Sequence, residues 1–305
     1  MIRRDFLAAI GLLPFTALAQ SHPKKNQATS TDATWHTAVE RIEASLGGRV
    51  GVAVLDTHTG RQIDHRGGER FPMASTFKLL LAAQTLHRVD QGSDQFDRRI
   101  TYAKKDLVDY SPVTEPHADG TGLTVAELCE GMVTLSDNTA ANLLLASNGG
   151  PPALTAYLRT LGDDITRLDR NEPTLNEAKP GDPRDTTTPL SMLHCIQAVA
   201  LGEVLSPGSR EKLQGWLLAN RTGDKRLRSR LPAGWKAGEK TGTGAHGSSN
   251  DVGVFFPPGR KPIVVTCYLT ANEASPDQRD AAIAEVGPLV VGWVLASEAT
   301  TEAAK

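Results

Sequence analysis

The pattern of apolar and polar residues changes character twice along the chain. Runs rich in β-branched residues and bounded by turn residues predict strands. These runs lie at residues 49–55, 62–66, 250–256 and 262–269. The first two are separated by a short turn, as in an antiparallel hairpin, and the last two by a Pro-Pro-Gly-Arg turn. Strand-forming sequence therefore comes from both ends of the chain.

Between these runs the apolar residues recur at helical spacing. Helices are predicted at residues 77–86, 125–133, 138–145, 154–161, 189–201, 211–218 and 276–297. The segment 236–244 leads into the strand that begins at residue 250 and is expected to form an edge strand of the same sheet.

These elements predict an α+β fold with two lobes and an active site in the crevice between them. Residues 33–70 and 219–305 are assigned to one lobe, in which an antiparallel sheet is flanked by terminal helices. Residues 71–218 are assigned to an all-helical lobe.

The helical lobe includes a polar loop at 169–188 that carries three prolines and has no clear periodicity. A long ordered loop usually carries function. Arg170 and Asp185 lie near its two ends. They either pair and close the neck of the loop or stand as two unlinked surface charges.

Residues 1–20 have the organisation of an export signal. Arg3 and Arg4 precede a mostly apolar stretch of roughly fourteen residues that ends in Ala-Leu-Ala. This stretch is shorter than the roughly 20 residues of a membrane-spanning helix, and the paired arginines resemble a twin-arginine address. We expect export to the periplasm and a flexible leader at 21–32. A buried N-terminal helix is the alternative.

Composition narrows the class of partner. The chain has 305 residues, 39% of them hydrophobic and 22% charged, with a net charge of -2. This balance favours neither nucleic acid nor an anionic membrane, so a small-molecule partner is expected. A monomer is expected because no amphipathic surplus suggests an interface. Cys129, Cys195 and Cys267 are an odd number without metal-ligand spacing, and each is interpreted as a buried small hydrophobe. No metal or cofactor is predicted.

The first candidate for chemistry is Ser75 with Lys78. Three residues apart on a helix, they share a face, and a desolvated lysine can accept the serine proton. The same Ser-x-x-Lys spacing occurs at 21–24 and 209–212, where Ser209 is interpreted as an ordinary helix N-cap. Only Ser75 has apolar sequence on both sides, which indicates a buried helix whose first N–H groups can stabilise an oxyanion.

Two further motifs are weak individually. Ser136-Asp137-Asn138 is either a helix cap or a source of a proton-relaying hydroxyl and a substrate-binding amide. Lys240-Thr241-Gly242 is either a glycine-rich turn or a carboxylate-binding strand, with the Thr243 N–H exposed to a ligand.

In this order the three motifs form a strong joint signal, and with their flanks at 69–74 and 139–143 the chain resembles a class A serine β-lactamase. The resemblance covers nearly the whole sequence after the leader. It extends to the loop segment 170–176, which is similar to the segment these enzymes use for deacylation and which penicillin-binding proteins lack.

The resemblance implies the role of each residue. Ser75 would attack the lactam carbonyl, within an oxyanion hole made by its own N–H and that of Thr243. Lys78 and Glu172 would both contact the Ser75 proton network, and which of them is the acylation base stays open. Ser136 would pass a proton to the leaving nitrogen. The substrate-binding residues would be Asn138, Lys240, Thr241, Gly242 and Tyr110, the last as an aromatic wall.

Hydrolysis of the resulting ester would depend on a water molecule. Physically, a carboxylate and an amide four residues apart can hold one water between them. By the resemblance, Glu172 and Asn176 would be these groups, and Glu172 would activate the water for attack on the Ser75 ester.

The sequence departs from the family at three places. Ser249 stands where many members have an arginine that complements the substrate carboxylate; Arg226 either replaces it or belongs to a solvated basic cluster. The pair Ala74 and Gly244 excludes the disulfide that some carbapenem-hydrolysing members have beside the nucleophile. Ala82 stands where other members have the cysteine that would pair with Cys129.

The resemblance thus implies a hydrolase of penicillins and cephalosporins that confers antibiotic resistance. One rival is a penicillin-binding or D,D-peptidase-like enzyme, which would acylate but deacylate slowly; Glu172 with Asn176 argues against it. The other is a catalytically inactive binding protein on the same fold, against which the intact set of polar residues argues.

Overall fold

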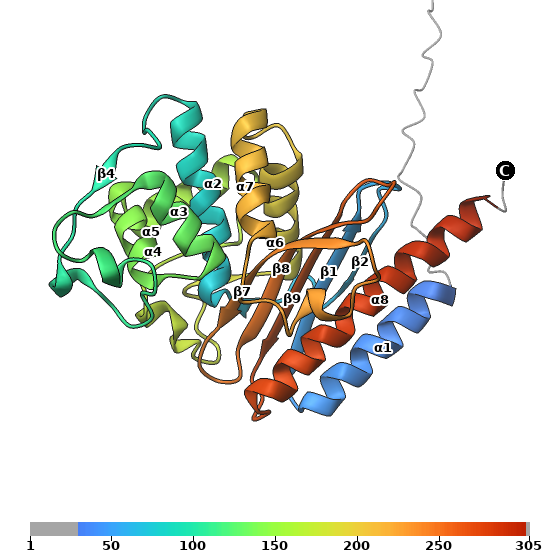
Figure 1. Ribbon diagram of the computed structural model, residues 1–305. Coiled ribbons are helices and arrows are strands. Elements are labelled where there is room, and N and C mark those ends of the chain that lie inside the picture. Colours follow the sequence, from blue (N-terminus) through green and yellow to red (C-terminus); the bar gives the residue numbers. More distant parts are fainter. Residues whose placement is uncertain (1–29, 303–305) are drawn as a thin grey trace, which may run out of the picture.

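The computed structural model describes residues 30–302 of the chain. Its centre is a five-stranded antiparallel sheet with the strand order β2-β1-β9-β8-β7 (Figure 1). The strands are β1 (Arg49–Asp56), β2 (Gln62–His65), β7 (Lys236–Thr243), β8 (Ser249–Phe256) and β9 (Ile263–Thr270). The predicted strands are thus present, and β7 is the expected edge strand.

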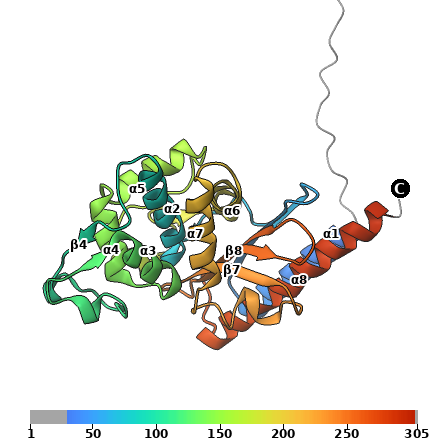
Figure 2. The same cartoon turned by 45° about the horizontal axis from the view of Figure 1, so that its top comes forward.

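One face of the sheet is covered by the two terminal helices, α1 (Ser30–Leu46) and α8 (Pro276–Glu302), which lie side by side (Figures 1 and 2). Both bury apolar side chains against the sheet, among them Trp35 and Trp293. The C-terminal end predicted for the flexible leader at 21–32 is wrong, because helix α1 already begins at Ser30. The proposed signal peptide lies outside the described residues.

The helical lobe packs against the other face of the sheet and contains α2 (Phe77–Asp90), α3 (Val125–Thr134), α4 (Asn138–Ser147), α5 (Gly150–Thr160), α6 (Pro189–Ile196) and α7 (Pro207–Leu218) (Figure 2). Every residue of α2 from Phe77 to Leu86 is buried, so α2 is the central helix of this lobe. A short π-helical segment, Gln197–Leu201, extends α6. No described helix is long and apolar enough to span a bilayer.

Short elements complete the chain. Two-stranded pairs are formed by β3 (Phe71–Pro72) with β6 (Thr186–Thr187) and by β4 (Arg99–Ile100) with β5 (Leu123–Thr124). Single 3-10 turns lie at Ala74–Thr76, Lys104–Asp106, Glu115–His117, Thr174–Glu177 and Leu227–Arg230. Together these elements confirm the predicted α+β fold, and the β3–β6 pair fastens the end of the long polar loop beside the approach to α2.

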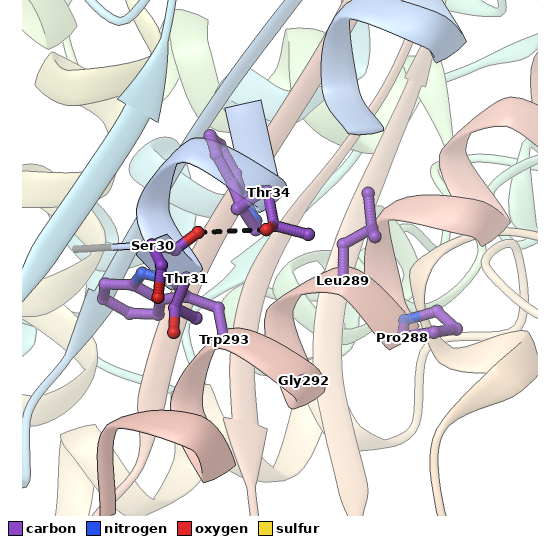
Figure 3. A pocket seen from close by; sticks show the side chains of 8 residues that line it. Ser30, Thr31, Thr34, Pro288, Leu289, Gly292 and Trp293 are labelled. Atoms are coloured by element: carbon purple, nitrogen blue, oxygen red, sulfur yellow. Dashed lines mark hydrogen bonds between the residues drawn. The ribbon is translucent and has the colours of Figure 1, made fainter. Parts of the chain in front are cut away.

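A hollow between the terminal helices is lined by Ser30, Thr31, Thr34, Trp35, Pro288, Leu289, Gly292 and Trp293 (Figure 3). None of these eight side chains is an acid, a base or a thiol. Trp293 Nε1 donates to Asp32 Oδ1 at 2.7 Å, which ties α8 to α1. This hollow therefore belongs to the packing of the two helices, and the chemistry of the chain has to be found elsewhere.

Candidate active site

The residues predicted for the site converge on one crevice of about 360 Å³ between the two lobes. It is lined by Ser75, Tyr110, Ser136, Asn138, Asn176, Thr222, Arg226, Thr241, Gly242 and Thr243. Lys78, Glu172 and Lys240 are buried and contact the lining residues through their polar atoms. Thr222 is the lining residue that sequence reasoning missed.

The serine is presented by a short, strained turn. Ala74 has a φ of 43°, in the left-handed region that non-glycine residues rarely adopt, and Ser75 follows it at the start of α2. The neighbours Met73 and Phe77 are buried, so the apolar flanks anchor the turn and leave Ser75 at the crevice.

The two competing Ser-x-x-Lys matches give no second site. The match at 21–24 lies outside the described residues. At 209–212 the predicted cap is wrong, because Ser206 is the N-cap of α7 and accepts from the Ser209 N–H. Ser209 is buried and donates to Asp90 at 2.6 Å. Its hydroxyl is therefore occupied by a structural hydrogen bond.

Ser75 and Lys78 meet a shared carboxylate. Ser75 Oγ donates to Glu172 Oε1 at 3.2 Å, and Lys78 Nζ lies 3.0 Å from the same oxygen. Lys78 Nζ also donates to Asn138 Oδ1 at 2.5 Å and to the Ser136 carbonyl at 2.8 Å. Burial lowers the pKa of Lys78, and the Glu172 charge only partly opposes this. The arrangement favours an amine able to take up a proton.

Glu172 is fixed by backbone and side-chain contacts. Its N–H and its carbonyl are both bound by the side-chain amide of Asn142, at 2.9 Å each. Asn176 Nδ2 donates to Glu172 Oε2 at 2.5 Å, so one carboxylate oxygen faces the serine and the other faces an amide. Sequence reasoning missed Asn142, which lies thirty residues before its partner.

An ion pair between Arg170 and Asp185 closes the neck of the loop, which is the first of the two alternatives that the sequence allowed. Arg170 Nε lies 2.6 Å from Asp185 Oδ2, and the Asp185 side chain is almost fully buried. Asp185 Oδ1 also accepts from the backbone N–H of Arg170. The pair fixes the start of the loop a few residues before Glu172.

The Ser136-Asp137-Asn138 motif contains both a helix cap and a hydroxyl that faces the crevice, on different residues. Asp137 is the N-cap of α4 and accepts from the Ala140 N–H at 2.7 Å. Ser136 has a φ of 62° and turns its hydroxyl toward Lys240, whose Nζ donates to Ser136 Oγ at 3.0 Å. The cap thus holds the serine at the crevice.

Lys240 is fully buried on β7 beside a second lysine. Burial lowers the pKa of Lys240 well below its ordinary value, and the charge of Lys78 lowers it further. Gly242 on the same strand permits close packing, because a methyl group there would lie 2.8 Å from Met73 O and 3.2 Å from Ser75 N. The edge strand therefore lies against the turn that carries the nucleophile.

Arg226 is not part of a solvated basic cluster, since it is only 8% exposed. It donates to the carbonyls of Gly242 and Asn250 at 3.0 and 2.8 Å and pairs with Asp280 at 2.8 Å. Its NH2 donates to Thr243 Oγ1 at 2.9 Å. A guanidinium thus lies at the end of β7, on the lining of the crevice.

The comparisons with known proteins agree with this geometry. The sequence model of the "Beta-lactamase enzyme family" matches residues 35–294. The chain is 44% identical to β-lactamase AST-1 of Nocardia asteroides, over 95% of this chain and 94% of that protein. It is also 44% identical to β-lactamase L2 of Stenotrophomonas maltophilia, over 94% and 97% respectively. The solved structure of an ancestral (GNCA) class A β-lactamase is similar at a TM-score of 0.83 and 64% identity, covering 84% of this chain and 98% of that one. The chain belongs to the class A β-lactamases.

Ser249 and Tyr110, which the resemblance connects with substrate binding, differ in burial in this β-lactamase. Ser249 is buried, and its hydroxyl accepts from Arg279 Nε at 3.0 Å, a contact that sequence reasoning missed. Tyr110 is 59% exposed and is one of the residues that line the crevice. Arg226 lines the same crevice and is held by its ion pair with Asp280.

The cysteines of this β-lactamase are all buried, as predicted from their apolar context, and none of the three forms a disulfide. Within residues 30–302 no three histidine, cysteine or carboxylate side chains cluster as metal ligands would. The polar groups of the crevice are serine, lysine, carboxylate, amide and guanidinium, a set suited to acyl transfer.

Proposed function

We propose that this β-lactamase hydrolyses the lactam amide of penicillins and cephalosporins through an acyl-enzyme on Ser75, which a water activated by Glu172 then clears. The observation that carries the proposal is the placement of one buried carboxylate between two partners. One Glu172 oxygen contacts Ser75 Oγ and the other contacts Asn176 Nδ2. Hydrolysis of such antibiotics confers resistance to them.

Acylation begins with attack of Ser75 Oγ on the lactam carbonyl. The serine proton passes into the network formed by Glu172 and Lys78. Glu172 Oε1 accepts from Ser75 Oγ, and Lys78 Nζ lies 3.0 Å from the same carboxylate oxygen. Charge develops on the carbonyl oxygen, where the backbone N–H groups of Ser75 and Thr243 stabilise it. Loss of one such donor typically costs about 10²-fold to 10³-fold in rate.

The C–N bond then breaks, and Ser136 relays the proton from the Lys78 and Glu172 network to the leaving nitrogen. Lys240 contacts the Ser136 hydroxyl and so supports its orientation. The substrate carboxylate binds at the end of β7, where Thr241, Thr243 and Arg226 line the crevice. Asn138 binds the acylamide side chain of the substrate, and Tyr110 forms the wall beside it.

Deacylation requires a water between Glu172 and Asn176. Glu172 takes a proton from that water, whose oxygen attacks the ester carbonyl. The C–O bond to Ser75 then breaks, and Ser75 Oγ regains a proton from the Glu172 and Lys78 network. A penicillin-binding protein lacks this step and stays acylated. Turnover is therefore the property that separates the proposed function from its rival.

The test is mass spectrometry of the mature protein and its Glu172→Ala variant, sampled over time after mixing with benzylpenicillin. We expect the wild type to turn over and the variant to accumulate as an adduct on Ser75. Glu177→Ala is the matched control, because Glu177 lies on the same loop with its carboxylate half exposed and paired with Arg170. A wild type that itself stays acylated would replace hydrolysis with penicillin binding. The acylation rate of Glu172→Ala also measures how well Lys78, without Glu172, takes the proton of Ser75.

We also propose that the protein acts as a monomer in the periplasm after twin-arginine export. The Arg3-Arg4 pair and the short apolar stretch after it support this location. Replacing both arginines with lysine should leave the precursor in the cytoplasm, measured by cell fractionation. Light scattering of the mature protein should give the mass of one chain.

A further inference from the structure

Asn250 is a buried side chain that links the sheet to the turn before the nucleophile. It lies on β8, opposite Gly242 of β7, and has no exposed surface. Its Nδ2 donates to the carbonyls of Pro72 and Met73, at 2.9 and 3.0 Å. The two protons of the amide are thereby both used, which fixes the orientation of the side chain.

The turn that Asn250 holds has a demanding geometry. Its next residue is Ala74 with a φ of 43°, so the backbone needs support from outside the turn. Met73 receives such support from a second side as well, because its N–H donates to Asp185 O at 2.9 Å. The residue after Ala74 is Ser75, whose N–H is the first donor of the oxyanion hole.

The second donor, the Thr243 N–H, belongs to a different part of the molecule. Thr243 ends β7, the strand paired with β8. The main-chain carbonyl of Asn250 accepts from Arg226, which also holds the Gly242 carbonyl and the Thr243 hydroxyl. Through its side chain and its main chain, Asn250 thus joins the two elements that supply the two donors.

An oxyanion hole works only if both donors keep a fixed spacing while charge develops. One donor follows the turn before α2, and the other lies at the end of an edge strand. We propose that Asn250 is a positioning residue of the oxyanion hole, which holds the Ser75 N–H in register with the Thr243 N–H. This inference rests on the proposed acyl transfer.

The test compares Asn250→Ala and Asn250→Asp with a matched control. Aspartate keeps the volume of asparagine, so a cavity cannot account for its effect. Asn148→Ala is the control: Asn148 is also buried, its Nδ2 donates to Thr85 Oγ1 at 2.9 Å, and it lies in the helical lobe. In both asparagines Oδ1 has no protein partner among residues 30–302.

The readouts are the acylation rate constant, the dissociation constant of the complex that precedes acylation, and the affinity for phenylboronic acid. A boronic acid forms a tetrahedral adduct with a serine hydroxyl and so reports on the oxyanion hole directly. Both Asn250 variants should lose about 10-fold to 10²-fold in the acylation rate constant and the same factor in boronate affinity, below the loss of a whole donor. The dissociation constant before acylation should stay within about two-fold, because ground-state binding does not use the hole.

Asn148→Ala should lose thermal stability and keep both functional constants. The proposal is overturned if the Asn250 variants lose stability as Asn148→Ala does yet keep the wild-type acylation rate and boronate affinity. It is also overturned if ground-state binding falls by the same factor as the acylation rate. Failure of the proposed function would look different, since the wild type would then not hydrolyse the penicillin at all.

Discussion

The two buried lysines of the crevice have the same burial and opposite surroundings. Lys78 comes from the central helix and lies 3.0 Å from the Glu172 carboxylate. Lys240 comes from the edge strand, and its Nζ donates to a hydroxyl and to the Thr241 carbonyl, with no carboxylate within ion-pair distance among residues 30–302. Both pKa values are lowered by burial, that of Lys240 the more so because it feels the charge of Lys78.

This difference separates two tasks that a single lysine could not perform. An amine that shares a carboxylate with the nucleophile is suited to exchange protons with it. An amine surrounded by neutral oxygens lacks an anion, and a substrate carboxylate would supply one. In the proposed mechanism the helical lobe therefore contributes proton transfer and the sheet contributes binding, and both act on one substrate in the crevice between them.

The largest effect is expected on acylation. Lys78→Met should lower the acylation rate constant by about 10²-fold to 10⁴-fold, since it removes a proton acceptor beside Ser75. Lys240→Met should lower kcat/KM by about 10-fold to 10²-fold, chiefly through KM, as expected for one charge-assisted contact. Stopped-flow kinetics with a chromogenic cephalosporin checks both. Equal losses in the two variants, or a Lys240 effect confined to kcat, would contradict the division of tasks.

Stability should separate the same two variants. Lys78→Met leaves Glu172 buried without its cation, and breaking a buried pair costs about 3 to 5 kcal/mol. Lys240→Met removes a desolvated charge beside another cation, so it should leave the free energy of unfolding at pH 7 unchanged or raise it. Urea denaturation at pH 7 measures both. A larger loss of unfolding free energy in Lys240→Met than in Lys78→Met would contradict this expected order.

A smaller effect is expected on the pH dependence of stability. The pKa of Lys240 falls on folding, so between that lowered value and its ordinary 10.5 the unfolded chain binds more protons than the folded one. Stability attributable to Lys240 therefore rises with pH through this window. The difference in unfolding free energy between wild type and Lys240→Met should shift in favour of the wild type from pH 7 to pH 10. Parallel curves for the two proteins would mean that Lys240 keeps its ordinary pKa.

Much of this architecture follows from local sequence. The strands and helices have periodic apolar residues. The edge strand predicted at 236–244 is present as β7, and the strand that follows it in the sequence is β8. The three motifs could be found because each is contiguous, and they contribute Ser75, Ser136 and Thr241 to one crevice. Such features need no knowledge of the folded chain.

The supporting contacts did not follow from the sequence, because they join residues that are far apart. Asn250 binds Met73 across 177 residues, and Asn142 binds Glu172 across thirty. Asparagine is also common in turns and caps, so no local pattern marks these two. The start of α1 was missed for another reason: its first turn is polar and continues the composition of the leader before it.

The smallest effect is expected for a third lysine, which tests whether environment rather than residue type makes the other two distinct. Lys225 Nζ lies 3.2 Å from Asp277, and these side chains are 75% and 87% exposed. An exposed pair of this kind contributes little, because water screens both charges and each side chain loses freedom when they pair. Lys225→Met should change the free energy of unfolding by less than about 0.5 kcal/mol and leave kcat/KM unchanged. The same urea and stopped-flow measurements apply, with the identical lysine-to-methionine change at all three positions. Suppose that Lys225→Met loses activity as Lys240→Met does. Substrate binding would then depend on positive charge spread along this side of the crevice, and not specifically on the buried Lys240.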